Sequence, residues 1–230
     1  MNQKAVVLLS GGLDSTTALY VALRDAYQVS ALTLDYGQLH KKEIECARQN
    51  AESLALTHEI VRFALPWKGS ALLDDKIPMP VGRTVELMQA SIPVTYVPAR
   101  NTIFLSFAAS YAETIGASAI FIGANALDYS GYPDCRPDYF TAFQKTLDLG
   151  TKSGIEGKKM IIAAPLIHLT KREIVLLGES LGVPFERTWS CYQGQAVPCS
   201  VCDSCRLRAK GFQEAGFKDP LLIRAASADR

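Results

Sequence analysis

A stretch of hydroxyl, glycine and acidic residues near the N-terminus has the composition of a phosphate site. The run Ser10-Gly11-Gly12-Leu13-Asp14-Ser15-Thr16 follows the apolar residues 5–9 and precedes the largely apolar residues 17–23, so it lies where a strand turns into a helix. Two glycines let backbone N–H groups approach an anion closely, and the unpaired N–H groups of the following helix add partial positive charge. The sequence therefore predicts a phosphate-binding loop.

This loop differs from the two common nucleotide loops. It has neither the lysine of a Walker loop nor the three spaced glycines of a dinucleotide fingerprint. It carries Asp14 instead, and a carboxylate beside phosphates is unfavourable unless a divalent cation lies between them. We therefore expect Mg-ATP as the ligand, with Mg²⁺ on Asp14. The alternative, a glycine-rich turn without a ligand, leaves the acid and the hydroxyls without a purpose.

Four of the six cysteines form a second group, Cys191, Cys199, Cys202 and Cys205, within fifteen residues. In a reducing compartment such a cluster favours a metal ion over disulfides, and four thiolates suit tetrahedral Zn²⁺. A closed site with four protein ligands has no position for water, so we expect one structural zinc ion per chain. An iron–sulfur cluster uses the same four ligands and stays open as an alternative.

Further polar motifs lie between these two groups. Residues 35–40 read in part as a simple turn around Gly37. Arg100 and Asn101 come at the start of an apolar helix, where an arginine could bind phosphate oxygens in a bidentate manner. The loop 128–138 combines tyrosines, acids and an arginine, which suits a flat heterocycle that bears a carboxylate. Its alternative is an ordinary polar surface loop.

Composition limits the class of protein. The chain has 230 residues, 48% of them hydrophobic, and its 24 basic and 23 acidic residues leave a net charge of +1. This balance gives no general attraction to nucleic acid or to an anionic membrane. The first apolar run is too short for a signal peptide, and no run approaches the length of a membrane span. We expect a cytoplasmic protein that acts on small molecules, with no direct nucleic-acid partner.

Alternating strands and helices must position these groups. Apolar runs predict strands over 5–9, 29–35, 58–63, 119–123 and 161–167, and helical spacing predicts helices near 44–54 and over 103–115. A capping box at 170–173 opens a helix that ends near Gly182, and another begins near Ser204. The pattern predicts an α/β fold with a doubly wound, parallel, five-stranded sheet, whose ligands bind at the carboxyl ends of the strands. The proline-rich stretch 66–98 is expected to be a loop-rich insertion near the site.

These motifs together carry a family resemblance. SGGLDS is typical of the PP-loop, or N-type ATP pyrophosphatase, superfamily, whose members cleave ATP between the α and β phosphates. With DYGQLHKKE, GYPDCRPDYF and the C-x₇-C-x₂-C-x₂-C tail, the chain resembles the 7-cyano-7-deazaguanine synthases of queuosine precursor biosynthesis from about residue 4 to 216. Two features depart from that pattern: Ala99 replaces the glycine of a V-P-G-R-N motif, and residues 65–94 follow no pattern that can be aligned.

The resemblance implies an ATP-dependent ligase that converts 7-carboxy-7-deazaguanine and ammonia into a nitrile, through an adenylated carboxylate and an amide. It also implies a homodimer. We expect residues 1–185 to form the ATP-binding catalytic domain and 186–230 a small zinc module. Expected ATP-binding residues are Leu9, Ser10, Gly11, Gly12, Leu13, Asp14, Ser15, Thr16, Thr17, Ala18 and Leu19; expected catalytic residues are Asp14, Ser15, Arg100 and Lys171; expected substrate-binding residues are Asn101, Asp128, Tyr132, Asp134, Cys135 and Arg136.

Two other functions stay open at this point. Another PP-loop ligase or tRNA-modifying enzyme would share the phosphate loop and use a different acceptor. Alternatively, the four-cysteine tail could be a zinc knuckle that binds nucleic acid, since Arg206, Arg208 and Lys210 follow it. Cys135 could also act as a covalent nucleophile, but ATP already supplies the activation, so we expect it to contact substrate instead.

Overall fold

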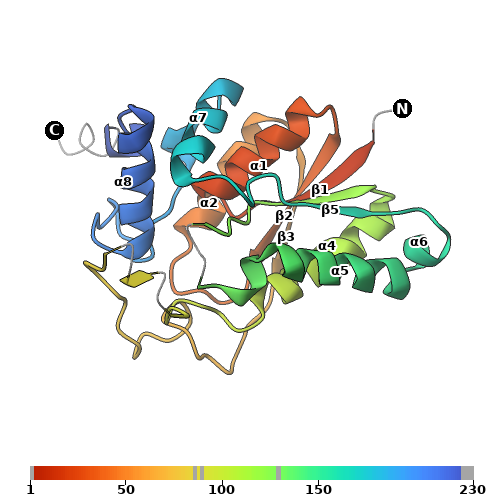
Figure 1. The fold of residues 1–230 in the computed structure, drawn as a ribbon, viewed down its shortest axis with the longest axis horizontal. Coiled ribbons are helices and arrows are strands. Elements are labelled where there is room, and N and C mark those ends of the chain that lie inside the picture. Colours follow the sequence, from red (N-terminus) through yellow and green to blue (C-terminus); the bar gives the residue numbers. More distant parts are fainter. Residues whose placement is uncertain (1–2, 85–86, 89–90, 128–130, 224–230) are drawn as a thin grey trace.

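A computed structural model describes residues 3–84, 87–88, 91–127 and 131–223. The predicted five-stranded parallel sheet is present, and its strand order is β3-β2-β1-β4-β5 (Figure 1). The strands are β1 Lys4–Leu8, β2 Gln28–Asp35, β3 Thr57–Arg62, β4 Ala119–Ile122 and β5 Ile161–Ala163. The chain winds to one side of β1 through β2 and β3, and to the other side through β4 and β5. The loop after β1 therefore lies at the switch point, where sheets of this kind bind ligands.

Helices cover both faces of the sheet (Figure 1). The α-helices are α1 Leu13–Arg24, α2 Lys42–Ser53, α4 Arg100–Ile115, α5 Pro137–Gly150, α6 Lys152–Ile155, α7 Lys171–Leu181 and α8 Asp203–Ala215, and the short 3₁₀ helices are η1 Pro133–Cys135 and η2 Phe185–Arg187. Val6 and Leu8 of β1 pack with Leu105 and Phe140 on the α4 and α5 side. Alternate residues of β1 face α1 and α2. Because both faces are buried at the central strands β1 and β4, these two strands read as continuous apolar runs.

Some predicted boundaries differ from the structure. The fifth strand ends at Ala163 instead of residue 167, because Pro165 has no N–H group for the ladder and the chain turns there. Helix α4 begins at Arg100, three residues before the predicted start. The sequence reading also treated residues 128–138 as loop, whereas α5 already begins at Pro137, which fits the first turn of a helix.

The capping box at the start of α7 is confirmed. Thr170 Oγ1 accepts a hydrogen bond from the N–H of Glu173 at 3.3 Å, and Glu173 Oε2 accepts one from the N–H of Thr170 at 2.8 Å. The helix ends at Leu181, and Gly182 has a φ of 72°. These contacts fix the position of Lys171, the first residue of α7.

The C-terminal helix α8 packs against α7 and shares a core with it (Figure 1). Phe185 and Phe212 meet edge to face, with ring centroids 5.2 Å apart, and Leu13 of α1 belongs to the same cluster. The segment 66–98 runs mainly as turns and irregular chain over its described residues, with helical backbone at 87–88, and Val81 forms an isolated bridge with Cys202. No helix in the described part of the chain is long and apolar enough to cross a membrane.

Candidate active site

The loop between β1 and α1 is shaped by its glycines and serines. Gly11 has a φ of 87°, and a Cβ atom there would lie 2.0 Å from the carbonyl oxygen of Glu43, so only glycine fits. Ser10 Oγ and Ser15 Oγ are 2.9 Å apart, and Ser10 Oγ accepts a hydrogen bond from the N–H of Gly12 at 3.2 Å. The predicted strand–loop–helix turn is present, and α1 begins directly behind it.

The end of β4 presses against this loop from the neighbouring strand. A Cβ atom on Gly123 would lie 2.6 Å from the backbone N of Ser15 and 2.7 Å from the carbonyl carbon of Asp14. Any side chain at Gly123 would therefore displace the backbone of the predicted phosphate loop. The sequence analysis included Gly123 in a strand and gave it no role.

Asp14 and Lys171 form an ion pair at the start of α1. Lys171 Nζ donates to both carboxylate oxygens of Asp14, at 2.7 Å and 2.8 Å. The Lys171 side chain is only 7% exposed and that of Asp14 17%. A cation at the N-terminus of α7 opposes the helix dipole, and the Asp14 carboxylate offsets that cost. The structure thus brings two predicted catalytic residues together across 157 positions of sequence.

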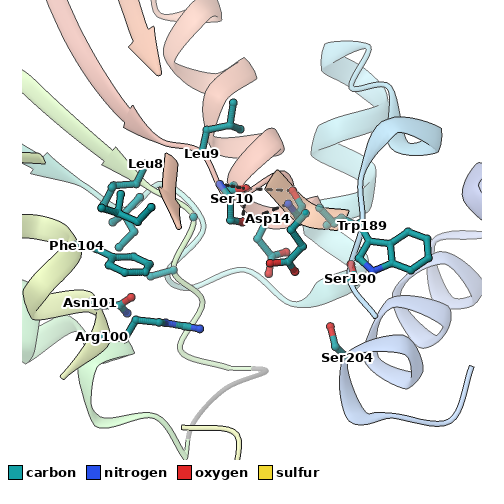
Figure 2. A pocket seen from close by; sticks show the side chains of 18 of the residues that line it. Leu8, Leu9, Ser10, Asp14, Arg100, Asn101, Phe104, Trp189, Ser190 and Ser204 are labelled. Atoms are coloured by element: carbon teal, nitrogen blue, oxygen red, sulfur yellow. Dashed lines mark hydrogen bonds between the residues drawn. The ribbon is translucent and has the colours of Figure 1, made fainter. Parts of the chain in front are cut away.

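A cavity of about 210 Å³ opens beside this pair. In Figure 2 the loop residues Ser10 and Asp14 lie in the middle, with Arg100 and Asn101 on one side and Trp189, Ser190 and Ser204 on the other. Of the predicted ATP-binding residues, those that line the cavity are Leu9, Ser10, Gly12, Leu13, Asp14 and Ser15. Gly11, Thr16, Thr17, Ala18 and Leu19 are buried behind it, and the Thr16 and Thr17 hydroxyls donate to the carbonyls of Gly12 and Leu13.

The opposite wall comes from the start of α4 and from η1. Arg100 projects into the cavity (Figure 2), and although burial lowers the pKa of its guanidinium, the neighbouring Tyr36, Tyr132 and Asp134 raise that pKa overall. The carboxylate of Asp134 accepts a hydrogen bond from the N–H of Asn101 at 3.0 Å. An acid at the N-terminus of α4 is favoured by the helix dipole. Because its pKa is raised, the Arg100 guanidinium stays protonated, and this wall carries a positive charge opposite the predicted phosphate loop.

The predicted substrate-binding residues divide into three groups. Asn101, Tyr132 and Cys135 line the cavity, and Asp134 is buried behind them, against Asn101. Arg136 has an exposed side chain at the N-cap of α5 and does not line the cavity. Asp128 lies outside the described residues.

Glu43 of α2 is a cavity residue that the sequence analysis did not assign. Burial raises the pKa of its carboxyl to about 7, Arg100 opposes that rise, and Cys191 and Asp14 add to it. Helical periodicity does not tell which polar side chain of a helix faces a cavity. The place of Glu43 in the DYGQLHKKE motif was therefore the only sequence signal for a role in the site. Trp189, Ser190 and Tyr192, which also line the cavity, follow η2 without any regular pattern.

The four tail cysteines lie together, with their sulfur atoms within 4.8 Å of one another. Tetrahedral Zn–S bonds of about 2.3 Å would place pairs of sulfurs about 3.8 Å apart, close to this spacing. Backbone N–H groups of Gln193 and Cys199 point at Cys191 Sγ, at 3.4 Å and 3.3 Å, which suits a thiolate. The donor set therefore fits a structural metal ion.

The cysteine segment also contacts the phosphate loop. The N–H of Trp189 donates to the carbonyl of Gly11 at 2.9 Å, and its indole Nε1 donates to the carbonyl of Cys191 at 2.9 Å. One residue thus joins the metal-binding segment to the loop at the switch point.

Comparison with known proteins agrees with this arrangement. The family described as "Queuosine biosynthesis protein QueC" matches residues 4–216. The chain belongs to the QueC family. A relative from Trichodesmium erythraeum (strain IMS101), named 7-cyano-7-deazaguanine synthase, is 56% identical over 221 residues, which are 95% of this chain and 100% of the relative. A relative of the same name from Nostoc punctiforme is 57% identical, over 95% of this chain and 99% of the relative. Another from Thermoplasma acidophilum is 55% identical, over 95% of this chain and 91% of the relative.

Ala99, which departs from the glycine of the V-P-G-R-N motif, has a physical consequence in this QueC protein. It is the N-cap of α4 and adopts a left-handed backbone with a φ of 54°. Glycine adopts this conformation without strain, whereas in alanine it costs about 1 kcal/mol of conformational free energy. Arg100 nevertheless begins the helix, so the substitution leaves the wall of the cavity in place.

Arg208 weighs against the zinc-knuckle alternative for this QueC protein. Its guanidinium is buried, donates to both carboxylate oxygens of Asp219 at 2.7 Å and 2.9 Å, and donates to Thr188 Oγ1 at 2.7 Å. Lys210 lies near Glu214 at 3.7 Å. A side chain committed to a buried ion pair does not bind a phosphate backbone, so Arg208 is withdrawn from the basic cluster read from the sequence, while Arg206 and Lys210 stay exposed.

Proposed function

We propose that this protein makes 7-cyano-7-deazaguanine from 7-carboxy-7-deazaguanine, ammonia and ATP, the reaction product for which its relatives are named. The observation that carries the proposal is the QueC match across residues 4–216, together with a cavity that joins a phosphate loop to a polar, aromatic wall. Such a cavity has the two halves that a nucleotide and a small heterocycle need.

The chemistry explains why ATP is required. A carboxylate at neutral pH is a poor electrophile, so its oxygen first attacks the α phosphate, and pyrophosphate leaves. Ammonia then displaces AMP to give the amide, and AMP keeps one carboxylate oxygen. The amide oxygen attacks a second ATP in the same way, and loss of AMP with that oxygen, together with the N–H protons, leaves the nitrile.

Each half of the cavity has a role in this scheme. We assign the pyrophosphate to the loop at Gly12 and Ser15, and the growing negative charge of the transition state to Lys171 and Arg100. Asp14 would hold Mg²⁺, which neutralises phosphate charge when bound. The Lys171 ammonium already lies on the Asp14 carboxylate, so a bound Mg²⁺ would share this carboxylate with the lysine.

We assign the heterocycle to the opposite wall of the cavity, formed by the start of α4 and by η1. Tyr132 offers an aromatic face, and Asn101 and Cys135 lie beside it. Burial raises the pKa of the Cys135 thiol to about 12, with Asp134 adding to the rise. A thiol with that pKa is protonated at neutral pH, so we assign Cys135 a contact with substrate and no covalent step.

We further propose that the four cysteines hold one structural Zn²⁺ and that residues 186–230 act as its module. Metal analysis and visible absorbance separate zinc from an iron–sulfur cluster, which is coloured. We also propose a cytoplasmic location, from the composition, and a homodimer, which the family resemblance implies. Sedimentation tests the dimer.

The test is to incubate the purified protein with Mg-ATP, ammonium and 7-carboxy-7-deazaguanine and to follow heterocycle and nucleotide by mass spectrometry. We expect nitrile, AMP and pyrophosphate, and loss of all three in Asp14→Ala. Asp25→Ala, an exposed acid at the far end of α1, is the matched control. Absence of ATP turnover in a protein that binds ATP would refute the proposal and point to another carboxylate or a tRNA acceptor.

A further inference from the structure

Helix α8 approaches Lys171 through a glycine that neither the proposed mechanism nor the family match assigns. A Cβ atom on Gly211 would lie 2.3 Å from Cγ of Lys171, 3.1 Å from its Cβ and 3.2 Å from its carbonyl oxygen. Real Cβ atoms do not approach other heavy atoms to 2.3 Å. The lysine stem therefore runs across the one face of α8 that has no side chain.

This passage determines where the ammonium group ends. Lys171 begins α7, and its stem must cross the α7–α8 contact before Nζ reaches Asp14 at 2.7 Å and 2.8 Å. The side chain is only 7% exposed, so it has no solvent-side route to the same position. A methyl group on Gly211 would push the stem away from α8 and draw Nζ off the Asp14 carboxylate.

Helix α8 is held at several points, and its N-terminal end carries two of the four clustered cysteines. Cys202 is the N-cap of α8 and Cys205 lies in its first turn. Arg208 and Phe212, on the same helix, anchor it through Asp219 and Phe185. Gly211 therefore stands on a helix that is held at several points and cannot easily withdraw.

We propose that Gly211 is a positioning residue for Lys171: its missing side chain lets the lysine stem cross α8 and places the ammonium group on Asp14 at the phosphate loop. The proposal rests on the proposed function only where kcat is measured, because the positioning of Lys171 can also be tested without turnover. Gly211→Ala is expected to lower kcat about 100-fold, the order that follows a displacement of about 1 Å in a catalytic group. The KM for the heterocycle, which binds at the opposite wall, should change little.

A matched control separates positioning from loss of packing. Gly154→Ala in α6 makes a clash of similar severity, with its Cβ 2.4 Å from the carbonyl oxygen of Asp148, at the opposite end of the molecule from α8 (Figure 1). Both variants should lower the melting temperature, and only Gly211→Ala should lower kcat. An equal fall of kcat in both variants would overturn the proposal.

A double variant asks whether Gly211 acts through the lysine. Lys171→Met keeps a stem in the same place and removes the ammonium group. If Gly211 only positions that group, Gly211→Ala lowers kcat no further in the Lys171→Met background. A further fall of the same size as in the wild type would show that Gly211 acts by another route and would contradict the proposal.

A third readout needs no turnover. Mass spectrometry after brief treatment with an amine-reactive reagent should find Lys171 protected in the wild type and in Gly154→Ala, and labelled faster in Gly211→Ala. Equal protection in all three would overturn the proposal even if the enzyme is active. If the wild type makes no nitrile but the labelling differs as expected, the proposed function fails and the positioning role stands.

Discussion

Glu43→Gln tests the electrostatics of the cavity most quantitatively. The ordinary pKa of this carboxyl is 4.5, and burial raises it to about 7 in the folded protein. Below pH 4.5 the carboxyl is protonated in both states and its burial carries no penalty. As the pH rises from 4.5 through 7, the unfolded chain releases this proton while the folded chain retains it, so the folded state loses stability.

The size of the effect follows from the shift. A difference of about 2.5 pKa units corresponds to about 3 kcal/mol once the pH exceeds both values, because each unit is worth about 1.4 kcal/mol. Between about pH 5.5 and about pH 8.5 the change is about 2 kcal/mol, since part of the penalty is already present at the lower pH. Glutamine has nearly the same shape and no charge, so the variant should lack this pH dependence.

The assay is urea unfolding of wild type and Glu43→Gln, at matched metal content, at both pH values. We expect the stability of the variant relative to the wild type to improve by about 2 kcal/mol from the lower to the higher pH. Titration of the cysteines is common to both proteins and cancels in the difference, whereas the effect of Cys191 on Glu43 is already part of the raised Glu43 pKa. A relative stability that is the same at both pH values would show that the Glu43 carboxyl ionises normally, and the reasoning would fail.

Other substitutions test separate parts of the structure. Gly123→Ala should weaken Mg-ATP binding about 10-fold in calorimetry, because its methyl group would lie 2.6 Å from the N of Ser15 and disturb the loop. A 10-fold loss corresponds to about one charge-assisted hydrogen bond. Gly150→Ala, whose methyl group would have no atom within 4 Å, should bind Mg-ATP normally. Cys202→Ser should lose the bound metal by elemental analysis and lower the melting temperature, and an unchanged metal content would remove Cys202 from the ligand set. Arg208→Ala should lower the free energy of unfolding by about 3–5 kcal/mol in urea titrations, because it leaves a buried carboxylate unpaired, and a change under 1 kcal/mol would contradict a structural role.

The sequence predicted the sheet because its signals are local. The apolar runs at β1, β2 and β4 are buried on both faces and are bounded by turn residues, so their type and order could be read directly. The phosphate loop and the cysteine cluster are short motifs and could be read for the same reason. The fifth strand was extended too far because the residues after Ala163 stay apolar, although Pro165 cannot continue the ladder.

The parts that sequence reasoning missed depend on contacts between distant residues. The ion pair of Lys171 and Asp14 spans 157 positions, and nothing in either local motif states that they meet. Gly123 and Gly211 matter only because of what packs against them in three dimensions. Arg208 looked like a nucleic-acid contact because a basic residue beside a cysteine cluster carries no mark of burial, and its partner Asp219 follows outside the helix.

The central claim is that ATP activates the substrate carboxyl by adenylation, and oxygen tracing tests it most directly. 7-Carboxy-7-deazaguanine labelled with ¹⁸O in both carboxylate oxygens would be incubated with Mg-ATP and ammonium, and the nucleotide and phosphate products analysed by mass spectrometry. We expect the label in AMP, unlabelled pyrophosphate, and two AMP for each nitrile formed. Label in inorganic phosphate, with ADP as the nucleotide product, would show attack on the γ phosphate and would contradict the account.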